Sequence, residues 1–191
     1  DGQAWINVGK ATAYYEFTEG LEDGAHTVRV MAVDALGNEG DYSDAYTFIV
    51  DTTPPGRPDM PTTTPILTNQ EDQEWAWNAV NDAGCGLNYY EVRIDGKGST
   101  ISRPDPETAT TYSTSLTDGI HFLQVRSVDR LGNTSLWSDP GYVTVDLTPP
   151  GIPLMKTLPP FTNAATVRFE WTKSSADTDH YEISYTVDGG E

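Results

Sequence analysis

The sequence predicts an all-β protein built from tandem β-sandwiches, and three observations carry this prediction. Apolar residues alternate with polar ones at every second position, as in strands with one buried face. Turn signals recur about every 8–12 residues, and no stretch has the apolar stripe of an amphipathic helix. The chain also repeats itself at an interval of 95 residues, which is enough for one sandwich of about seven short strands.

The repeat is a duplication of a whole structural unit. Between positions 23–58 and positions 118–153, 18 of 36 residues are identical. The phrase VDTTPPG at 50–56 returns as VDLTPPG at 145–151. Internal repeats of this kind indicate that similar units follow one another along the chain.

The phase of the repeat sets the expected domains. Residues 53–147 hold one complete sandwich, residues 1–52 the C-terminal half of a preceding one, and residues 148–191 the N-terminal half of a following one. Both ends are cut in the same phase, which leaves two explanations open. Either the chain is a window of a longer array, or the C-terminal half of one copy supplies strands to the N-terminal half of the next.

Strand faces follow from the alternation. In the complete unit, Trp75 and Trp77 share one face of a strand, and Tyr90, Val92 and Ile94 share one face of the next. We expect these side chains to point into the core and the charged residues between them to point outward.

The anchor residues resemble the fibronectin type III domain. Trp77 and Trp171 match the tryptophan of its second strand, and Tyr90 and Tyr181 begin the pattern of its third strand. More broadly, the chain is similar to Ig-like repeats of bacterial and archaeal surface proteins, which often end a domain with D-x-TPP. The resemblance implies tandem Ig-like (fibronectin type III-like) sandwiches of about seven strands each, joined by rigid D-x-TPP linkers.

One departure from that family concerns its sixth strand, which the runs 21–38 and 116–133 resemble. The family usually has a tyrosine where this chain has His26 and His121. The tyrosine hydroxyl ties the strand corner back to the backbone. Either an imidazole N–H substitutes for the hydroxyl, or the corner is looser.

The repeated phrase is expected to be a stiff spacer between sandwiches. Paired prolines fix φ near about −65°, lack an N–H donor and favour extended backbone. They end the sheet and hold consecutive units in a fixed orientation, so that the array becomes a rod. The linker-rigidifying residues are Asp51, Pro54, Pro55, Asp146, Pro149 and Pro150.

Aspartates gather near the predicted junctions. Asp51 and Asp146 lie in the linkers, and Asp34 and Asp129 lie in the turn before the last strand. Hard carboxylate oxygens suit Ca²⁺, and the related surface repeats often rigidify in this way. Aspartate in a turn also caps backbone N–H groups, and the chain has no DxDxDG ligand ladder. A junctional Ca²⁺ site at these four residues and a purely structural capping role both stay open.

Composition and motifs exclude several functional classes. A net charge of −18 repels nucleic acid and anionic lipid, so neither is an expected partner. No apolar run reaches the length of about 18 residues that a membrane helix needs. The sequence has no GxSxG, HExxH, CxxC or phosphate-loop motif, so we expect no enzymatic activity.

A few residues bear on modification and ligand binding. Asn133 begins an Asn-Thr-Ser sequon, a candidate glycosylation site. Cys85 is the only cysteine, so no disulfide forms within the chain. Trp5, Tyr14 and Tyr15 are a candidate sugar-binding strip.

The expected role is non-catalytic and structural. The chain is predicted to be a spacer of an extracellular or cell-surface protein or fibre, such as an adhesin, stalk or filament. Its expected partners are neighbouring repeats or neighbouring copies, without nucleic acid and without membrane insertion. Two alternatives are a module that binds glycan or protein and an accessory domain of a secreted polysaccharide-degrading enzyme. A binding module predicts aromatic residues clustered in one unit, whereas a spacer predicts a repeat-symmetric surface.

Overall fold

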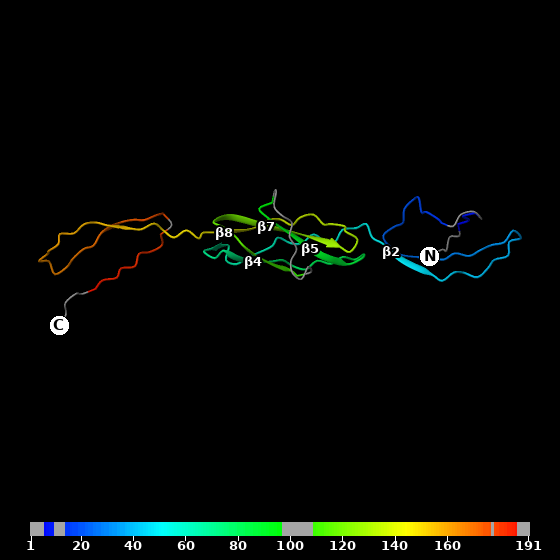
Figure 1. The fold of residues 1–191 in the computed structure, drawn as a ribbon, viewed down its shortest axis with the longest axis horizontal. Coiled ribbons are helices and arrows are strands. Elements are labelled where there is room, and N and C mark those ends of the chain that lie inside the picture. The colour runs from blue at the N-terminus through cyan, green and yellow to red at the C-terminus, as the bar shows by residue number, and fades with distance from the viewer. Residues whose placement is uncertain (1–5, 10–13, 97–108, 177, 187–191) are drawn as a thin grey trace.

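The protein is all-β in the computed structural model, which describes residues 6–9, 14–96, 109–176 and 178–186. Within these ranges there are ten strands and no helix, and so no helix that could span a membrane. Three units follow one another along an extended molecule (Figure 1). The strands are β1 (Gly24–Val28), β2 (Tyr46–Val50), β3 (Leu67–Thr68), β4 (Asp72–Ala76), β5 (Leu87–Ile94), β6 (Thr111–Ser115), β7 (Gly119–Asp129), β8 (Gly141–Val145), β9 (Leu154–Met155) and β10 (Trp171–Thr172).

The middle unit is a sandwich of two sheets. One sheet has the order β3-β8-β7-β5, with β3 parallel to β8 and the other pairs antiparallel. The second sheet pairs β4 with β6 in antiparallel fashion. These neighbours correspond to strands C-F-G and B-E of an Ig-like sandwich, the fold class that the sequence predicts.

Both sheets contribute to one hydrophobic core. Trp77 packs edge-on against Tyr90 with ring centroids 5.6 Å apart, a favourable arrangement for an aromatic pair. The expected inward faces of β4 and β5 are confirmed, because their alternate residues are the buried ones. The core residues are Trp75, Trp77, Tyr90, Val92, Leu116, Leu123, Val125, Val143 and Val145.

The charged residues on the outward face of β5 are also partly covered. Arg93 and Arg126 lie over the ring of Trp137, with their Cζ atoms 4.3 and 4.7 Å from its centroid. Arg126 pairs with Glu91 at 2.6 Å. This cation–π stack explains why Glu91 and Arg93 are half-buried on a face expected to meet solvent.

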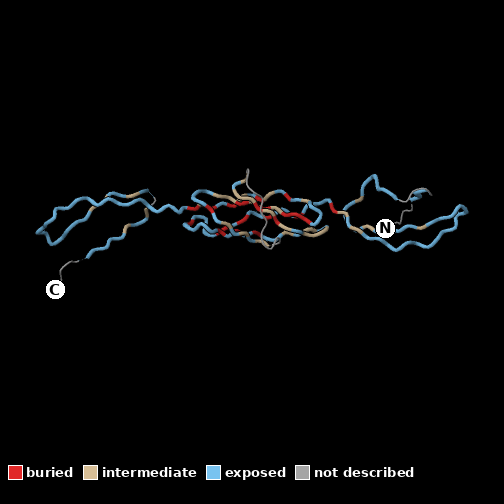
Figure 2. The backbone as a smooth tube through the Cα atoms, viewed as in Figure 1, coloured by how far each residue is buried: buried red, intermediate tan, exposed pale blue. Residues whose placement is uncertain are grey.

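Each outer unit presents one hairpin-like pair of strands. β1 pairs with β2 in the register Gly24↔Val50, which repeats the pairing Gly119↔Val145 of β7 with β8. β9 pairs with β10 over two residues. Most side chains in these two units are exposed, in contrast to the middle unit (Figure 2).

Histidine takes the place of the corner tyrosine in both copies of the motif. The Nε2 atom of His26 lies 2.7 Å from the carbonyl oxygen of Glu22, and that of His121 lies 2.9 Å from that of Thr117. The imidazole therefore substitutes for the missing hydroxyl, which is the first of the two predicted alternatives. The Nδ1 atom of His121 also lies 2.8 Å from Oδ2 of Asp95.

The second contact of His121 makes the middle unit sensitive to pH. Burial lowers the pKa of His121, but the bonds to Asp95 and Thr117 outweigh burial and raise this pKa above its ordinary value of 6.5. Two acceptors at the two ring nitrogens fit the imidazolium, which donates from both. The stabilisation is therefore complete below pH 6.5 and is lost as pH rises through the higher pKa of the folded state.

We expect the free energy of unfolding of the middle unit to fall over this interval of rising pH. Urea unfolding at a series of pH values measures it. Asp95→Asn is the matched variant, because asparagine tolerates the positive φ of 54° at this position. The variant should flatten the pH dependence. An unchanged slope in Asp95→Asn would contradict the assignment.

Candidate functional site: the junction between the first and middle units

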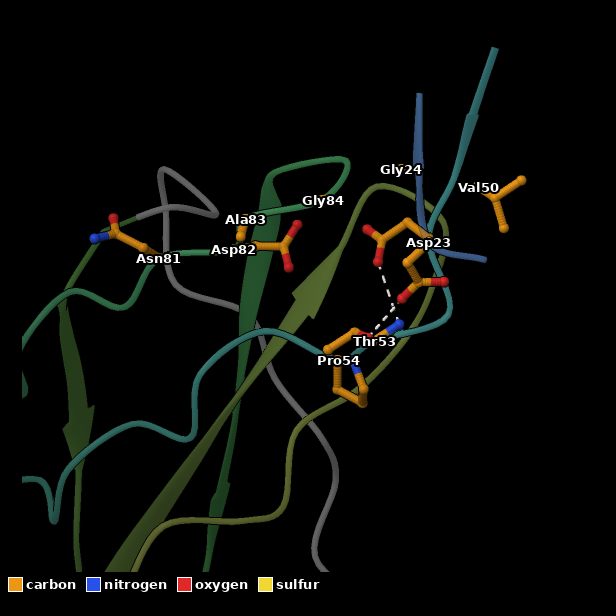
Figure 3. Close-up of a pocket in the computed structure, with 10 residues that line it drawn as sticks. Asp23, Gly24, Val50, Thr53, Pro54, Asn81, Asp82, Ala83 and Gly84 are labelled. Atoms are coloured by element: carbon orange, nitrogen blue, oxygen red, sulfur yellow. Dashed lines mark hydrogen bonds between the residues drawn. The ribbon is translucent and has the colours of Figure 1, made fainter. Parts of the chain in front are cut away.

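The repeated phrase leads directly out of β2 and into the middle unit. β2 ends at Val50 and β8 ends at Val145, where the sequence predicts each last strand to end. Figure 3 shows the linker passing from Val50 through Thr53 and Pro54, with Asp23 and Gly24 of the first unit on one side. The loop 81–84 of the middle unit lies on the other side. The junction is thus lined by residues from both units.

The first unit holds the linker through Asp23. Its Oδ1 accepts hydrogen bonds from the backbone N–H and the hydroxyl of Thr52, both at 2.9 Å. Its Oδ2 accepts one from the hydroxyl of Thr53 at 2.6 Å. The hydrogen bonds from Thr53 and Thr52 hold the pKa of Asp23 below its ordinary value. Asp118 makes the equivalent bond to Thr148, at 2.7 Å, so this tether is a repeated feature.

The middle unit holds the linker through Asp51. This residue is only 7% exposed, and its Oδ2 accepts a hydrogen bond of 2.7 Å from the backbone N–H of Cys85. Its Oδ1 accepts one from the N–H of Thr53 at 3.2 Å. The side-chain amide of Asn133 donates to the backbone carbonyl of Asp51 at 3.0 Å. Two loops of the middle unit, those that contain Cys85 and Asn133, therefore bind the same linker residue.

Gly84 makes room for this contact. A Cβ atom at position 84 would overlap the carboxylate group of Asp51. The close approach of the Asp51 carboxylate to the backbone at position 84 needs a residue without a side chain. The loop is therefore shaped to receive the linker.

Asp129 positions the amide that binds the linker. Its Oδ1 accepts hydrogen bonds from the N–H groups of Leu131 (2.9 Å) and Asn133 (2.8 Å), and its Oδ2 accepts one from the amide of Asn133 at 2.7 Å. Burial raises the pKa of Asp129, but the bonds from Asn133 and Leu131 outweigh burial and hold this pKa below its ordinary value. Asp34 caps the equivalent turn of the first unit in the same way, with Asn38 as its partner. Both aspartates therefore have the capping role.

The residues that follow the prolines are fixed as well. The backbone N–H of Gly56 donates to the carbonyl of Asn81 at 3.3 Å. The hydroxyl of Ser127 donates to the carbonyl of Gly56 at 2.7 Å. Arg57 donates from Nε to the carbonyl of Trp137 at 2.7 Å. The linker is therefore bonded to the middle unit on both sides of its proline pair.

The two junctions differ in how they are held. Asp146 forms the same local turn as Asp51, accepting from the N–H of Thr148 at 3.1 Å. Asp146 is exposed, however, and so are Pro149 and Pro150, whereas Pro55 at the first junction is buried and Pro54 is exposed. Among the described residues, Asp51 is the predicted linker residue that is hydrogen-bonded to the following sandwich, through Cys85 and Asn133.

Four side chains gather behind the first junction. One ligand atom from each of Asp51, Asp82, Cys85 and Asp129 lies within 4.8 Å of the others. Two members belong to the predicted Ca²⁺ set. The other two predicted residues, Asp34 and Asp146, lie outside this group, the one such group found within the described ranges.

The cluster fits hydrogen-bonded capping better than it fits Ca²⁺. Ca²⁺ takes about six to eight oxygen ligands, whereas five of the six carboxylate oxygens here already accept hydrogen bonds from N–H groups. The remaining donor, the thiol of Cys85, is soft and suits Ca²⁺ poorly.

We expect Ca²⁺ and EDTA to give the same melting temperature for this chain, because the carboxylates are satisfied by N–H donors. Differential scanning calorimetry in each condition measures it. An increase with Ca²⁺ that is lost in Asp82→Asn would instead assign a cation to the cluster. Asp41→Asn, at an exposed acidic position outside it, is the control for general charge effects.

Other predicted residues can now be placed. The Nδ2 atom of Asn133, where a glycan would attach, donates to Asp51 and Asp129, so modification would break both bonds. Burial and the nearby Asp51 raise the pKa of the Cys85 thiol, which makes it a weak nucleophile. In the candidate sugar-binding strip, Tyr14 and Tyr15 are exposed, and Trp5 lies outside the described residues.

A hollow of about 400 Å³ opens at the junction. It is lined by residues of the first unit, the linker and the loop at 81–84 (Figure 3). Its acidic side chains, Asp23, Asp51 and Asp82, accept hydrogen bonds from neighbouring residues of the chain. The acidic side chains that line the hollow are therefore already engaged in hydrogen bonds within the chain.

Some residues of this site were not predicted. Asp23 and Asp118 carry a signal in the sequence, since both begin an Asp-Gly pair at the same point of the repeat and precede a threonine-bearing linker. Gly84 and Cys85 carry none, because their loop has no close counterpart in the third unit. Their roles require knowledge of which loop meets the linker.

No family model matches the chain, and no curated protein sequence matches it. Module A71 of titin from human cardiac muscle is 18% identical, with a TM-score of 0.38, and covers 47% of this chain and 89% of that one. The fibronectin(III)-like modules of Clostridium thermocellum CbhA are 18% identical, with a TM-score of 0.38, and cover 66% of this chain and 64% of that one. The chicken CNTN1 FN1–FN3 domains are 15% identical, with a TM-score of 0.36, and cover 70% of this chain and 49% of that one. The chain spans less than two thirds of the length of the last two structures.

Proposed function

We propose that this chain is a non-catalytic spacer, a stretch of fibronectin type III-like sandwiches that holds its neighbours at a fixed distance and orientation in an extracellular or cell-surface protein. Neighbouring repeats or copies are its proposed partners. The residues that form hydrogen bonds in the described part of the chain belong to turns, strands and linkers. The net charge of −18 favours a soluble rod, because neighbouring molecules that lie side by side repel one another.

One observation carries the proposal, namely the docking of Asp51. A linker that only joined two domains would leave its polar groups to water. Here the Asp51 side chain and backbone accept hydrogen bonds from Cys85 and Asn133 of the next sandwich. Because Asp51 is buried, these bonds are shielded from solvent and favour one orientation of the two units.

Small-angle X-ray scattering tests the proposal with a matched pair of variants. Asp51→Ala removes the docked carboxylate, so we expect the molecule to become shorter on average. Its scattering should indicate a flexible hinge between the first and middle units. Asp146→Ala makes the same change at the equivalent, exposed position and should leave the angle between the first and middle units unaltered. Equal scattering from wild type and Asp51→Ala would contradict the spacer role of this residue.

A further inference from the structure

The outer face of the larger sheet in the middle unit departs from the repeat. Phe122 and Tyr142 lie opposite one another where β7 pairs with β8, with ring centroids 5.7 Å apart. The equivalent residues of the first unit are Thr27 and Thr47, whose hydroxyl oxygens lie 3.1 Å apart. An aromatic pair therefore stands where the first unit has a polar pair. A spacer alone predicts the same surface in both units, so this difference needs another explanation.

The aromatic pair belongs to a larger exposed apolar patch. Ile120 is 71% exposed, Leu67 is 67% exposed and Tyr142 is 56% exposed. Ile120 and Leu67 both pair with Thr144 of β8. Thr144 and Tyr142 are alternate residues of that strand, so all four side chains lie on one face of the sheet. Exposed apolar side chains that adjoin one another mark an interaction surface.

The patch is held in place by its neighbours in the sheet. The backbone N–H of Phe122 donates to Oδ1 of Asp95 at 3.0 Å. A Cβ atom at Gly96 would come within 2.9 Å of the ring of Phe122. Glycine at this position therefore leaves room for the ring, and its positive φ of 68° suits glycine. Because the face is already ordered, binding on it costs less conformational entropy.

Positive charge lies beside the patch on the same face. Arg93 pairs with Gln124, the next outward residue of β7 after Phe122. Arg93 donates from Nε and Nη2 to Oε1 of Gln124, at 3.1 and 2.8 Å. This acceptor is neutral and does not offset the charge of Arg93, whereas Arg126 is paired with the carboxylate of Glu91. A guanidinium has five N–H donors, so the bonds to Gln124 leave others to reach a carboxylate.

We propose that this face of the middle unit binds an acidic polypeptide segment that also carries apolar side chains. The apolar side chains of the segment pack on Tyr142 and Ile120, and one of its carboxylates pairs with Arg93. Aromatic residues and arginine are enriched at protein–protein interfaces. The side chain of Ile120 offers no hydrogen bond to a sugar hydroxyl, and the rings of Phe122 and Tyr142 meet at 51° and so form no single flat platform. The face therefore fits a polypeptide better than a carbohydrate.

Charge favours this occupant over a second copy of the chain placed face to face. Two such faces would bring one Arg93 towards another, and like charges repel. The chain as a whole, with a net charge of −18, attracts basic molecules, so an acidic segment depends on the local positive charge of Arg93. The inference goes beyond the spacer role, because it concerns the side of the middle unit and not the junction at Asp51.

Selection from a phage-displayed library of random peptides, with the intact chain as bait, tests the proposal. We expect the selected peptides to be enriched in acidic and in apolar residues together. One selected peptide is then synthesised and titrated into the chain labelled with nitrogen-15. Its binding should shift the amide signals of residues 120–124 and 142–144, and its affinity should fall as salt is added.

Two variants introduce the residues that the first unit has at the same positions. Tyr142→Thr and Ile120→Ala should each weaken binding of the synthetic peptide about tenfold, as expected near the centre of an interface. Arg93→Gln should remove most of the salt dependence. Leu131→Ala is the control, because Leu131 is 60% exposed but lies in the turn after β7. This variant should bind the peptide as the unaltered chain does.

A pool of basic peptides, or no selected pool, overturns the inference, and so does equal binding by the unaltered chain and Tyr142→Thr. Sedimentation and a glycan array test the other occupants. Self-association that is lost in Tyr142→Thr would assign the face to a second copy, and glycan binding that is lost in Tyr142→Thr would assign it to carbohydrate. Either result overturns the inference as well. The scattering of Asp51→Ala tests the spacer role separately, because Asp51 is not part of this face.

Discussion

Replacement of Asp129 by alanine is expected to lower the free energy of unfolding of the middle unit by about 2–4 kcal/mol, since each buried donor left without an acceptor costs about 1–3 kcal/mol. Asp129 is 1% exposed. Its carboxylate accepts from the N–H of Leu131 and from both the N–H and the amide of Asn133. Water cannot easily replace these bonds in the folded state. Urea unfolding followed by the fluorescence of the buried tryptophans measures the loss.

Asp34→Ala is the matched control, because Asp34 caps the same turn in the first unit with an exposed carboxylate. There water can satisfy the released N–H groups, and no tryptophan core depends on the turn. We expect the unfolding of the middle unit to be unchanged in this variant. If both variants lower the free energy of unfolding of the middle unit equally, or if Asp129→Ala does not lower it, burial of the Asp129 carboxylate does not stabilise this unit.

The second large effect is expected from Gly84→Ala. The added Cβ overlaps the carboxylate of Asp51, so the linker has to leave its place or the loop has to move, and overpacking of this kind costs about 1–3 kcal/mol. The hydrogen bond from the N–H of Cys85 to Asp51 is then lost. Proton–nitrogen NMR spectra report this loss directly, through an upfield shift of the Cys85 amide proton and its faster exchange.

Gly56→Ala serves as the comparison for that substitution. Gly56 also lies in the junction, but a Cβ there would meet its nearest atoms, Val80 Cβ and Asn81 O, at 3.5 and 3.6 Å, which are ordinary contacts. The Cys85 amide should keep its position in Gly56→Ala. If both glycine variants shift the Cys85 amide signal equally, the space left by Gly84 is not what allows Asp51 to dock.

Much of the fold could be predicted from the sequence, because local rules and global architecture agree here. The alternation around Trp75 and Tyr90 is a period-two signal, and the tertiary core buries those residues. The ends of β2 and β8 follow from the prolines that come after Val50 and Val145, since proline cannot extend the sheet ladder. The duplication supplied the three-unit organisation independently of any propensity.

The contacts across the junction could not be predicted in the same way. The sequence shows that aspartates lie in the linker and in the preceding turn, but it does not show their partners. The hydrogen bonds of Asp51 with Cys85 and Asn133 join residues that are 34 and 82 positions apart. Such contacts depend on how two folded units meet. The repeat also hides the difference between the two junctions. Asp51 and Asp146 occupy equivalent positions in the sequence, but of these two only Asp51 is buried.

The central claim is that the junction at Asp51 fixes the angle between two sandwiches, and one distance distribution tests it most directly. Spin labels at Asp41→Cys in the first unit and Glu74→Cys in the middle unit, both exposed positions, are placed in a Cys85→Ala background. Double electron–electron resonance should then give a single narrow distribution in the otherwise unaltered junction and a broad one in Asp51→Ala. A distribution that is already broad with Asp51 in place would contradict a rigid rod and reduce the linker to a flexible tether.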